Sequence, residues 1–225
     1  MSPLPHSQIL RGKIRLVEPR LAAVARRFWT HPRVGELVPE FLFLVHSMIR
    51  ASVPMLEAAA AAARRLPPGD PVAAPLADYF EKHAREELHH DEWLLADLAA
   101  LGRSREELLA RMPSPTVAAG VGAHYYWIHH VHPAAFLAYL AVLEGNPPEV
   151  DQLEDIRRRA GLPPEAFRTL VKHAHLDPHH RDDLDDTLDA LALTPSLHAL
   201  LGVAAFHTVE RVADAMEEIL DRFEG

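Results

Sequence analysis

Apolar residues recur three and four positions apart along most of the 225-residue chain, a pattern typical of amphipathic helices. No stretch shows the alternation of apolar and polar residues that indicates a half-buried strand. Proline and glycine divide the pattern into segments, so the sequence predicts an all-α protein of seven or eight helices. The expected helices cover residues 8–28, 34–66, 70–101, 104–112, 116–144 (one helix or two), 149–160, a helix that begins at Pro163-Pro164, and one from Thr194 to about residue 223.

Several prolines fall inside these segments, and each predicts a local irregularity because proline removes a helical hydrogen bond. Pro39 and Pro54 predict a late start or a kink in the segment 34–66. Pro133 marks a break in the segment 116–144. Pro178 predicts a kink beside Asp177 or a restart of the helix with Asp177 as its N-cap.

A pattern of histidine and acidic residues occurs twice, 90 residues apart and without a gap. Residues 83–94 and 173–184 both read His-Ala-x-x-acid-x-His-His-x-acid-x-Leu, and the match continues to residues 101 and 191. In each copy the spacing His-x3-acid-x2-His puts three side chains on one face of a helix, over two turns. The two triplets are His83, Glu87 and His90, and His173, Asp177 and His180.

Two imidazoles and a carboxylate on one face are suitable ligands for a divalent transition metal, iron above all. Either triplet alone has a simpler explanation, since polar residues such as Arg181 and Asp182 also cover solvated faces. Two copies in register, in a chain with 16 histidines, favour the metal hypothesis. We therefore expect the two helices to pack antiparallel, or nearly so, with the triplets facing each other around one or two ions.

Three further residues are candidate ligands. Glu144 shares an apolar stripe, and a buried unpaired carboxylate needs a cation or a donor; the alternative is an ordinary glutamate at a frayed helix end. His46 ends an apolar stretch, where it is either a ligand or a core histidine bonded to a carbonyl. Glu40, two turns earlier, is the alternative to His46.

Composition narrows the classes of protein that fit. The net charge of −9 without a basic block argues against nucleic acid as a partner. The absence of cysteine excludes disulfides, thiolate catalysis and cysteine-based clusters. No apolar run approaches the ~20 residues of a membrane span, and we expect a cytoplasmic protein that forms one domain over residues 1–225.

The chain resembles the heme-oxygenase-like diiron oxidases in three features. These are the motif His173-x3-Asp177-x2-His180, the upstream residue Glu144, and an earlier helix whose acidic and histidine residues end at His90. The segment 83–102 is similar to the iron-containing redox enzymes of that superfamily. The resemblance extends from about residue 40 onward. It implies a single heme-oxygenase-like helical bundle with iron bound in its middle, and oxidation of an amino acid, a fatty acid or another small metabolite by dioxygen, often in biosynthesis.

The chain departs from the family pattern in two places. The family has a glutamate seven residues before the first-helix histidine, where this chain has His83, and a glutamate on the preceding long helix, where His46 is the best-placed residue. More imidazoles and fewer carboxylates lower the negative charge of the site, so a mononuclear site or another metal stays open. Thiaminase-like relatives use a cysteine, which is absent here. Heme-degrading relatives need a histidine near the N-terminus, and His31 before Pro32 matches that position poorly.

We therefore expect a non-heme iron oxidase or oxygenase that binds Fe(II), one or two ions per chain, and uses O2 as co-substrate on a small-molecule substrate. An electron donor and a homodimer are compatible with this hypothesis. One alternative is a metal-dependent phosphohydrolase built on the adjacent pair His90-Asp91, although Asp91 projects about 100° away from His90 on a helix. The other alternative is a non-catalytic member that binds a metal or a small molecule.

Overall fold

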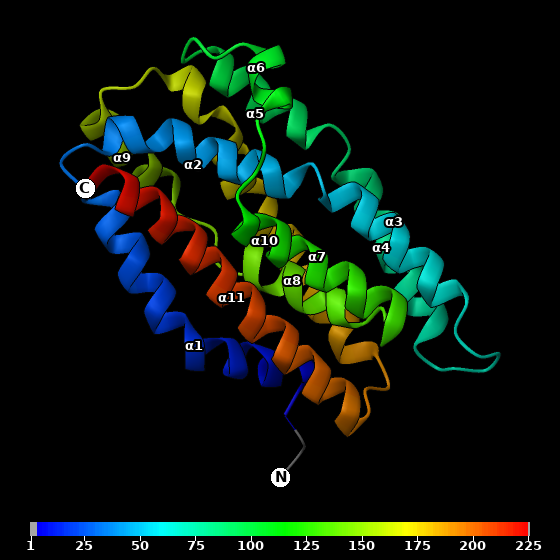
Figure 1. The fold of residues 1–225 in the computed structure, drawn as a ribbon. Helices are drawn as coiled ribbons and strands as arrows, with labels where there is room; N and C mark the ends of the chain where they lie inside the picture. The colour runs from blue at the N-terminus through cyan, green and yellow to red at the C-terminus, as the bar shows by residue number, and fades with distance from the viewer. Residues whose placement is uncertain (1–3, 225) are drawn as a thin grey trace.

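The computed structural model describes residues 4–224, and within that range the chain forms eleven α-helices, one 3-10 helix and no strand (Figure 1). This confirms the all-α prediction. The elements are α1 (His6–Trp29), α2 (Val34–Ile49), α3 (Ser52–Arg64), α4 (Ala73–Glu86), α5 (His90–Ala99), α6 (Arg105–Ala110), α7 (Pro115–His130), α8 (Ala135–Leu143), α9 (Val150–Ala160), η1 (Pro164–Phe167), α10 (Arg168–Ala190) and α11 (Pro195–Glu224).

The described part of the chain forms more helices than the seven or eight expected, because three of the expected long segments are interrupted and the helix from Pro163 begins as the separate 3-10 helix η1. The segment 34–66 divides into α2 and α3 at Arg50 and Ala51, and the segment 70–101 divides into α4 and α5. The first break directly precedes Pro54, which lies in the first turn of α3, so the irregularity predicted there is confirmed. The break predicted at Pro133 is also present, because α7 ends at His130 and α8 begins at Ala135. The break between α4 and α5 has no proline beside it. Pro39 lies inside α2 and Pro178 inside α10, so the expected restart at Asp177 does not occur.

The joint between α4 and α5 is the most consequential break. His89 adopts a left-handed conformation with φ 70°, and it is the only residue other than glycine with a positive φ in the described part of the chain. That conformation costs an L-residue about 1–2 kcal/mol. The expectation of one continuous helix that carries His83, Glu87 and His90 on one face was therefore wrong. The sequence did not predict this joint, because no glycine or proline marks it.

The long helices α1 and α11 lie side by side and run in the same direction (Figure 1). Arg27 near the end of α1 pairs with Glu224 at the end of α11, and Lys13 donates to the carbonyl of His198 near the start of α11. Apolar side chains fill the interior of the bundle. They include Phe80 of α4 and Phe136 of α8, which are both fully buried. In the interior α10 contacts α4, α5 and α8, so these four helices meet at one place.

The segment Val34–Arg64 is the one described stretch that is long and apolar enough to cross a membrane by length and composition alone, so the expectation that no apolar run approaches that length was wrong. A core helix of a folded domain passes the same test. Leu37, Val38 and Leu42 in α2 are fully buried, and α2 packs on α5, α9 and α11. The apolar composition of this segment is therefore explained by the core of the bundle.

Asp97 fastens α5 to the start of α10. Its Oδ2 accepts a hydrogen bond from the backbone N of Thr169 at 2.8 Å, and both residues are buried. Thr169 is the second residue of α10, so its N–H has no partner within its own helix. The carboxylate therefore fixes the distance between the helix that carries His90 and the helix that carries His173.

We expect Asp97→Ala to lower the free energy of unfolding by about 1–3 kcal/mol, because it leaves a buried backbone donor without a partner. Urea denaturation followed by circular dichroism measures this loss. Asp97→Asn is the matched control, since its amide oxygen can still accept the bond and should keep most of the stability. An equal loss in both variants would show that the charge of Asp97, and not the hydrogen bond, provides the stability.

Candidate metal centre

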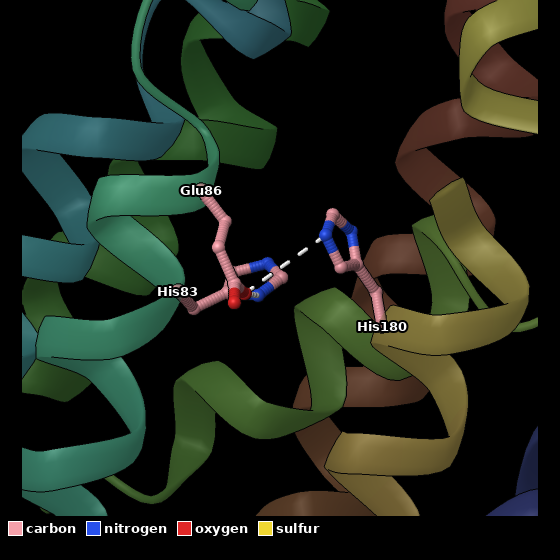
Figure 2. Close-up of side chains that lie close together, drawn as sticks. All are labelled: His83, Glu86 and His180. Carbon is pink, nitrogen blue, oxygen red and sulfur yellow. Dashed lines mark ion pairs between the residues drawn. The ribbon is translucent and has the colours of Figure 1, made fainter. Parts of the chain in front are cut away.

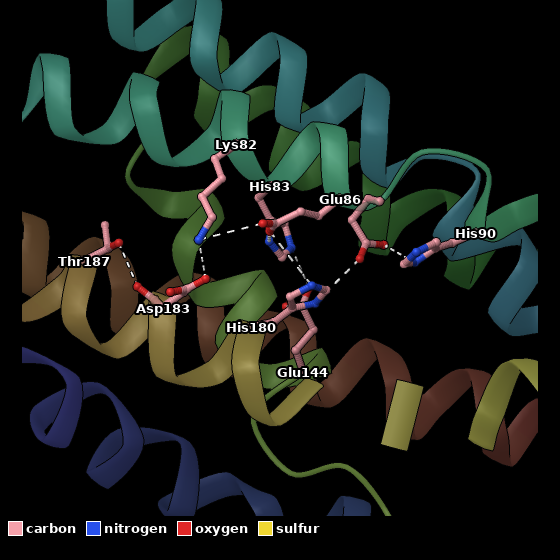
Figure 3. A network of polar contacts seen from close by, with 9 residues as sticks. Lys82, His83, Glu86, His90, Glu144, His180, Asp183 and Thr187 are labelled. Atoms are coloured by element: carbon pink, nitrogen blue, oxygen red, sulfur yellow. Dashed lines mark hydrogen bonds and ion pairs between the residues drawn. The ribbon is translucent and has the colours of Figure 1, made fainter. Parts of the chain in front are cut away.

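A cluster of imidazoles and carboxylates lies where α4, α5, α8 and α10 meet. The joint between α4 and α5 contributes one side of the cluster, the middle of α10 contributes the opposite side, and Glu144 approaches from the end of α8 (Figure 3). His83, Glu87, His90, Asp177 and His180 are all buried. Polar side chains of this kind lose their hydration when buried, so each must find a partner.

The first group of possible metal ligands consists of Glu87, His90 and His173. One donor atom from each lies within 4.8 Å of the others. Nδ1 of His90 is 3.2 Å from Oε2 of Glu87, and the rings of His90 and His173 are 5.1 Å apart between centroids. Nδ1 of His173 lies 3.0 Å from the carbonyl of Thr169, so it can donate a proton there and leave Nε2 free to coordinate.

The second group consists of His83, Glu86 and His180 (Figure 2), again with donor atoms within 4.8 Å of one another. The two imidazole rings are 4.6 Å apart between centroids. Oε2 of Glu86 is 3.6 Å from Nδ1 of His83 and 4.0 Å from Nε2 of His180. Each group thus has two imidazoles and one carboxylate.

Two carboxylates connect the groups. Glu144 places Oε1 3.2 Å from Nε2 of His83 and Oε2 3.6 Å from Nδ1 of His180. Glu87, a member of the first group, has its Oε1 3.7 Å from Nδ1 of His180 in the second. The two groups therefore form one continuous cluster.

The contacts also give the relative direction of the two triplets. His83 faces His180 and His90 faces His173, so the order along α4 and α5 is reversed along α10. The structure thus brings the triplets together in antiparallel fashion, as expected from the repeat. Binding of a metal by these residues stays a prediction.

Asp177 lies in the same buried region but in neither group. Burial, followed by the negative charges of Glu144 and Glu87, raises the pKa of Asp177 to about 8. Its Oδ1 has no hydrogen-bond partner among the described residues. Asp177 is therefore a further oxygen donor close to the cluster, next to the like charges of two other carboxyl groups.

The pKa shifts of the two imidazoles in the second group have opposite signs. Burial lowers the pKa of His180 to about 4, so its ring is neutral at pH 7, the form that binds a metal. Burial also lowers the pKa of His83, but the charge of Glu144 and its hydrogen bond outweigh that effect and raise it. Burial raises the pKa of Glu144 despite its contact with His83. A cation among these groups would favour the ionised carboxylates and the neutral imidazoles.

The cluster passes a simple test for a bound cation. Three buried atoms in it have no hydrogen-bond partner among the described residues: Nδ1 of His180, Oε2 of Glu144 and Oδ1 of Asp177. Unpaired buried polar atoms are rare in folded proteins and costly. Because lone pairs of nitrogen and oxygen are what a divalent transition metal requires, the residues fit a metal ion.

The structure leaves two candidate ligands outside both groups. His46 is buried with both ring nitrogens unpaired, and the charged groups that act on its pKa, namely Arg50, Asp91, Glu92 and Arg105, are not part of the cluster. Glu40 forms ion pairs with Arg111 and Arg222 at another part of the molecule. The expectation that a fourth helix supplies a ligand through His46 or Glu40 therefore has no support in the geometry.

Sequence reasoning did not identify Glu86 or Trp93. Glu86 follows His83 by three residues, a spacing that places both on one face of a helix and could have revealed it. The ring of Trp93 stacks on His90 at 3.9 Å between centroids, and Nζ of Lys172 lies 3.7 Å from the centroid of the Trp93 ring. The indole thus fixes the orientation of the His90 ring.

The chain was compared with protein-family models and with curated proteins. A family model described as iron-containing redox enzyme matches residues 53–215. No curated protein matches the chain significantly.

Solved structures with the same fold include three bacterial proteins. A domain of unknown function with a heme oxygenase-like fold from Shewanella denitrificans has a TM-score of 0.83 at 15% identity, over 99% of this chain and 95% of that one. A TenA homologue from Pseudomonas syringae has a TM-score of 0.75 at 14% identity, over 98% of both chains. A CADD-like protein of unknown function from Nostoc punctiforme has a TM-score of 0.72 at 13% identity, over 96% of this chain and 97% of that one. These similarities show the heme oxygenase-like fold.

We expect Fe(II) or Mn(II), added without oxygen to the metal-free protein, to raise its melting temperature by about 5–10 °C at ~100 times the dissociation constant. The reason is that the ion binds the folded cluster and relieves repulsion among buried carboxylates. Differential scanning calorimetry measures the shift. A double variant, His90→Ala with His180→Ala, should show almost none. An unchanged melting temperature in the unaltered protein would contradict a metal centre in this cluster.

Proposed function

The chain belongs to the iron-containing redox enzyme family, and from this premise we propose that it is a non-heme iron oxidase or oxygenase that uses dioxygen to oxidise a small metabolite. The proposal extends the family description in two respects, the kind of iron site and the oxidant. Its support comes from the residues of the cluster and from the fold.

The composition of the two groups is the observation that carries the proposal. Two histidines and one carboxylate are the ligand set of many non-heme Fe(II) oxygenases, which keep other positions open for oxygen and substrate. The cluster contains this set twice, once as Glu87, His90 and His173 and once as His83, Glu86 and His180. Since Glu87 and Glu144 lie between the groups, we favour two ions per chain over one.

Iron held in such a site supplies the reduction of dioxygen, which protein side chains alone do not perform. The contribution of the chain is to hold and orient the ligands and to keep water away. Trp93 orients His90, the carbonyl of Thr169 orients His173, and Asp97 fixes the start of the helix that carries His173. We propose a small-molecule substrate and a biosynthetic role from the resemblance alone.

The phosphohydrolase alternative finds no support in the arrangement. It requires the adjacent residues His90 and Asp91 to act on the same ion. Asp91 belongs to neither group of donors in the described part of the chain, whereas His90 does. A non-catalytic binding protein would keep the same cluster, so only reactivity with oxygen separates it from an oxidase.

The first test concerns iron content. We expect His90→Ala and His180→Ala each to lose at least half of the iron found in the unaltered protein, because each removes a buried imidazole from one group. Purification after expression with iron, followed by elemental analysis, measures this content. His179→Ala and His175→Ala are matched controls on α10, the helix of His180, since both histidines are exposed. Full iron content in His90→Ala or His180→Ala would place the metal elsewhere.

The second test concerns oxygen. Optical and Mössbauer spectra of the Fe(II)-loaded protein should change on exposure to oxygen in a manner that shows oxidation of the bound iron. Asp91→Ala should retain both iron and this reactivity, because Asp91 lies outside the donor groups. A loss of metal in Asp91→Ala as large as in His90→Ala would favour the phosphohydrolase. Spectra that stay unchanged in oxygen would favour a non-catalytic binding protein.

A further inference from the structure

The carboxylates of the two donor groups differ in how far they are open to solvent, and among the imidazoles only His173 of the first group is half-buried. The carboxylate of the first group, Glu87, is 7% exposed, whereas the carboxylate of the second, Glu86, is 36% exposed. The imidazoles His83 and His180 of the second group are themselves buried. Glu86 thus forms the solvent-facing side of an otherwise enclosed set of ligands.

Glu86 also has a competing partner. Nζ of Lys82 lies 3.7 Å from Oε1 of Glu86 and forms an ion pair with Asp183 on α10 (Figure 3). Lys82 and Asp183 are 48% and 45% exposed, so the three charges lie at the surface over the second group. The lysine therefore interacts with one carboxylate that faces His83 and His180 and with another that does not.

We propose that Glu86 is a ligand of an outer, exchangeable divalent-cation site with His83 and His180. Lys82 regulates occupancy of this site by competing with the cation for Glu86, and Asp183 does so by competing with Glu86 for Lys82. This inference rests on the proposed function and divides its metal centre into two unequal sites. The inner site, with Glu87, holds its ion more tightly. The outer site gains and loses its ion through the charged opening.

The signs of the competition follow from Coulomb's law. The ammonium group of Lys82 attracts the carboxylate that the outer cation needs, and its own charge repels that cation. Asp183 draws Lys82 away from Glu86 and adds a negative charge nearby. Removal of Lys82 should therefore tighten the outer site, and removal of the charge of Asp183 should weaken it.

The alternative is that Lys82, Glu86 and Asp183 form only an ordinary surface ion pair, which does not account for the buried imidazoles beside Glu86. Exposed ion pairs contribute little to stability and need no particular neighbours. Here the carboxylate that Lys82 contacts also faces two buried imidazoles, with its Oε2 3.6 Å from Nδ1 of His83 and 4.0 Å from Nε2 of His180. An accessible carboxylate that faces two buried imidazole nitrogens is what a cation site requires.

Anaerobic equilibrium dialysis of the full chain against Fe(II), with Mn(II) binding followed by electron paramagnetic resonance, tests the inference without measuring activity. The unaltered protein should bind two ions with unequal affinity. Glu86→Gln should keep the tight ion and weaken the other at least about tenfold, since it loses one charged ligand. Glu81→Gln is the matched control, because Glu81 lies on the same helix, is 45% exposed and pairs with Arg64.

Two further variants test the regulation itself. Lys82→Met should lower the dissociation constant of the weaker ion about three- to tenfold, and Asp183→Asn should raise it by a similar factor. Both exchange exposed side chains, so the fold should survive, and melting curves of the metal-free proteins check this.

The outcomes separate the inference from the function on which it rests. Two ions with unaltered affinities in Glu86→Gln, or a single ion in the unaltered protein, would overturn the inference and leave the iron oxidase proposal standing. Effects of Lys82→Met and Asp183→Asn in the same direction would overturn the regulatory part. Failure of the unaltered protein to bind any ion would overturn the proposed function as well.

Discussion

The burial of several carboxyl groups and imidazoles within a few ångströms of one another is the constraint on which the rest of the structure depends. Glu87, Glu144 and Asp177 approach one another closely enough for each to affect the others electrostatically. Without a cation such an arrangement is unfavourable, because buried like charges repel and their lost hydration is not replaced. The apolar packing of the surrounding helices must therefore hold the cluster together. A bound metal would turn the contribution of the cluster to the stability of the fold from unfavourable to favourable.

The joint between α4 and α5 resolves a geometric problem of this cluster. Consecutive residues on a helix project about 100° apart, yet Glu86 and Glu87 contribute to neighbouring donor groups. The helix ends at Glu86, so Glu87 lies at its C-terminal cap and His90 begins a new helix. The strained conformation of His89 is the local cost of this arrangement, and strain of this kind concentrates at functional sites.

The heme oxygenase-like fold is kept at 13–15% identity to the solved structures, whereas the chemistry depends on a few side chains inside it. The fold brings α4, α5, α8 and α10 together, and the ligand set decides what is bound there. Support from outside the cluster matters equally: Trp93 and the carbonyl of Thr169 orient imidazoles, and the charges of Lys82 and Asp183 lie over its open side. The fold and the chemistry of the site thus depend on different sets of residues.

The sequence by itself determined the all-helical class and the two triplets, because periodicity and ligand spacing are local properties of the chain. It also indicated Glu144, since an acid on an apolar helix face needs a partner. Only the tertiary structure decided that the helix breaks at His89, that Glu86 joins the cluster and that His46 stays outside it. These outcomes depend on which side chains from distant segments meet, and that is set by the packing of whole helices, where a favourable buried contact outweighs the local preference of a few residues.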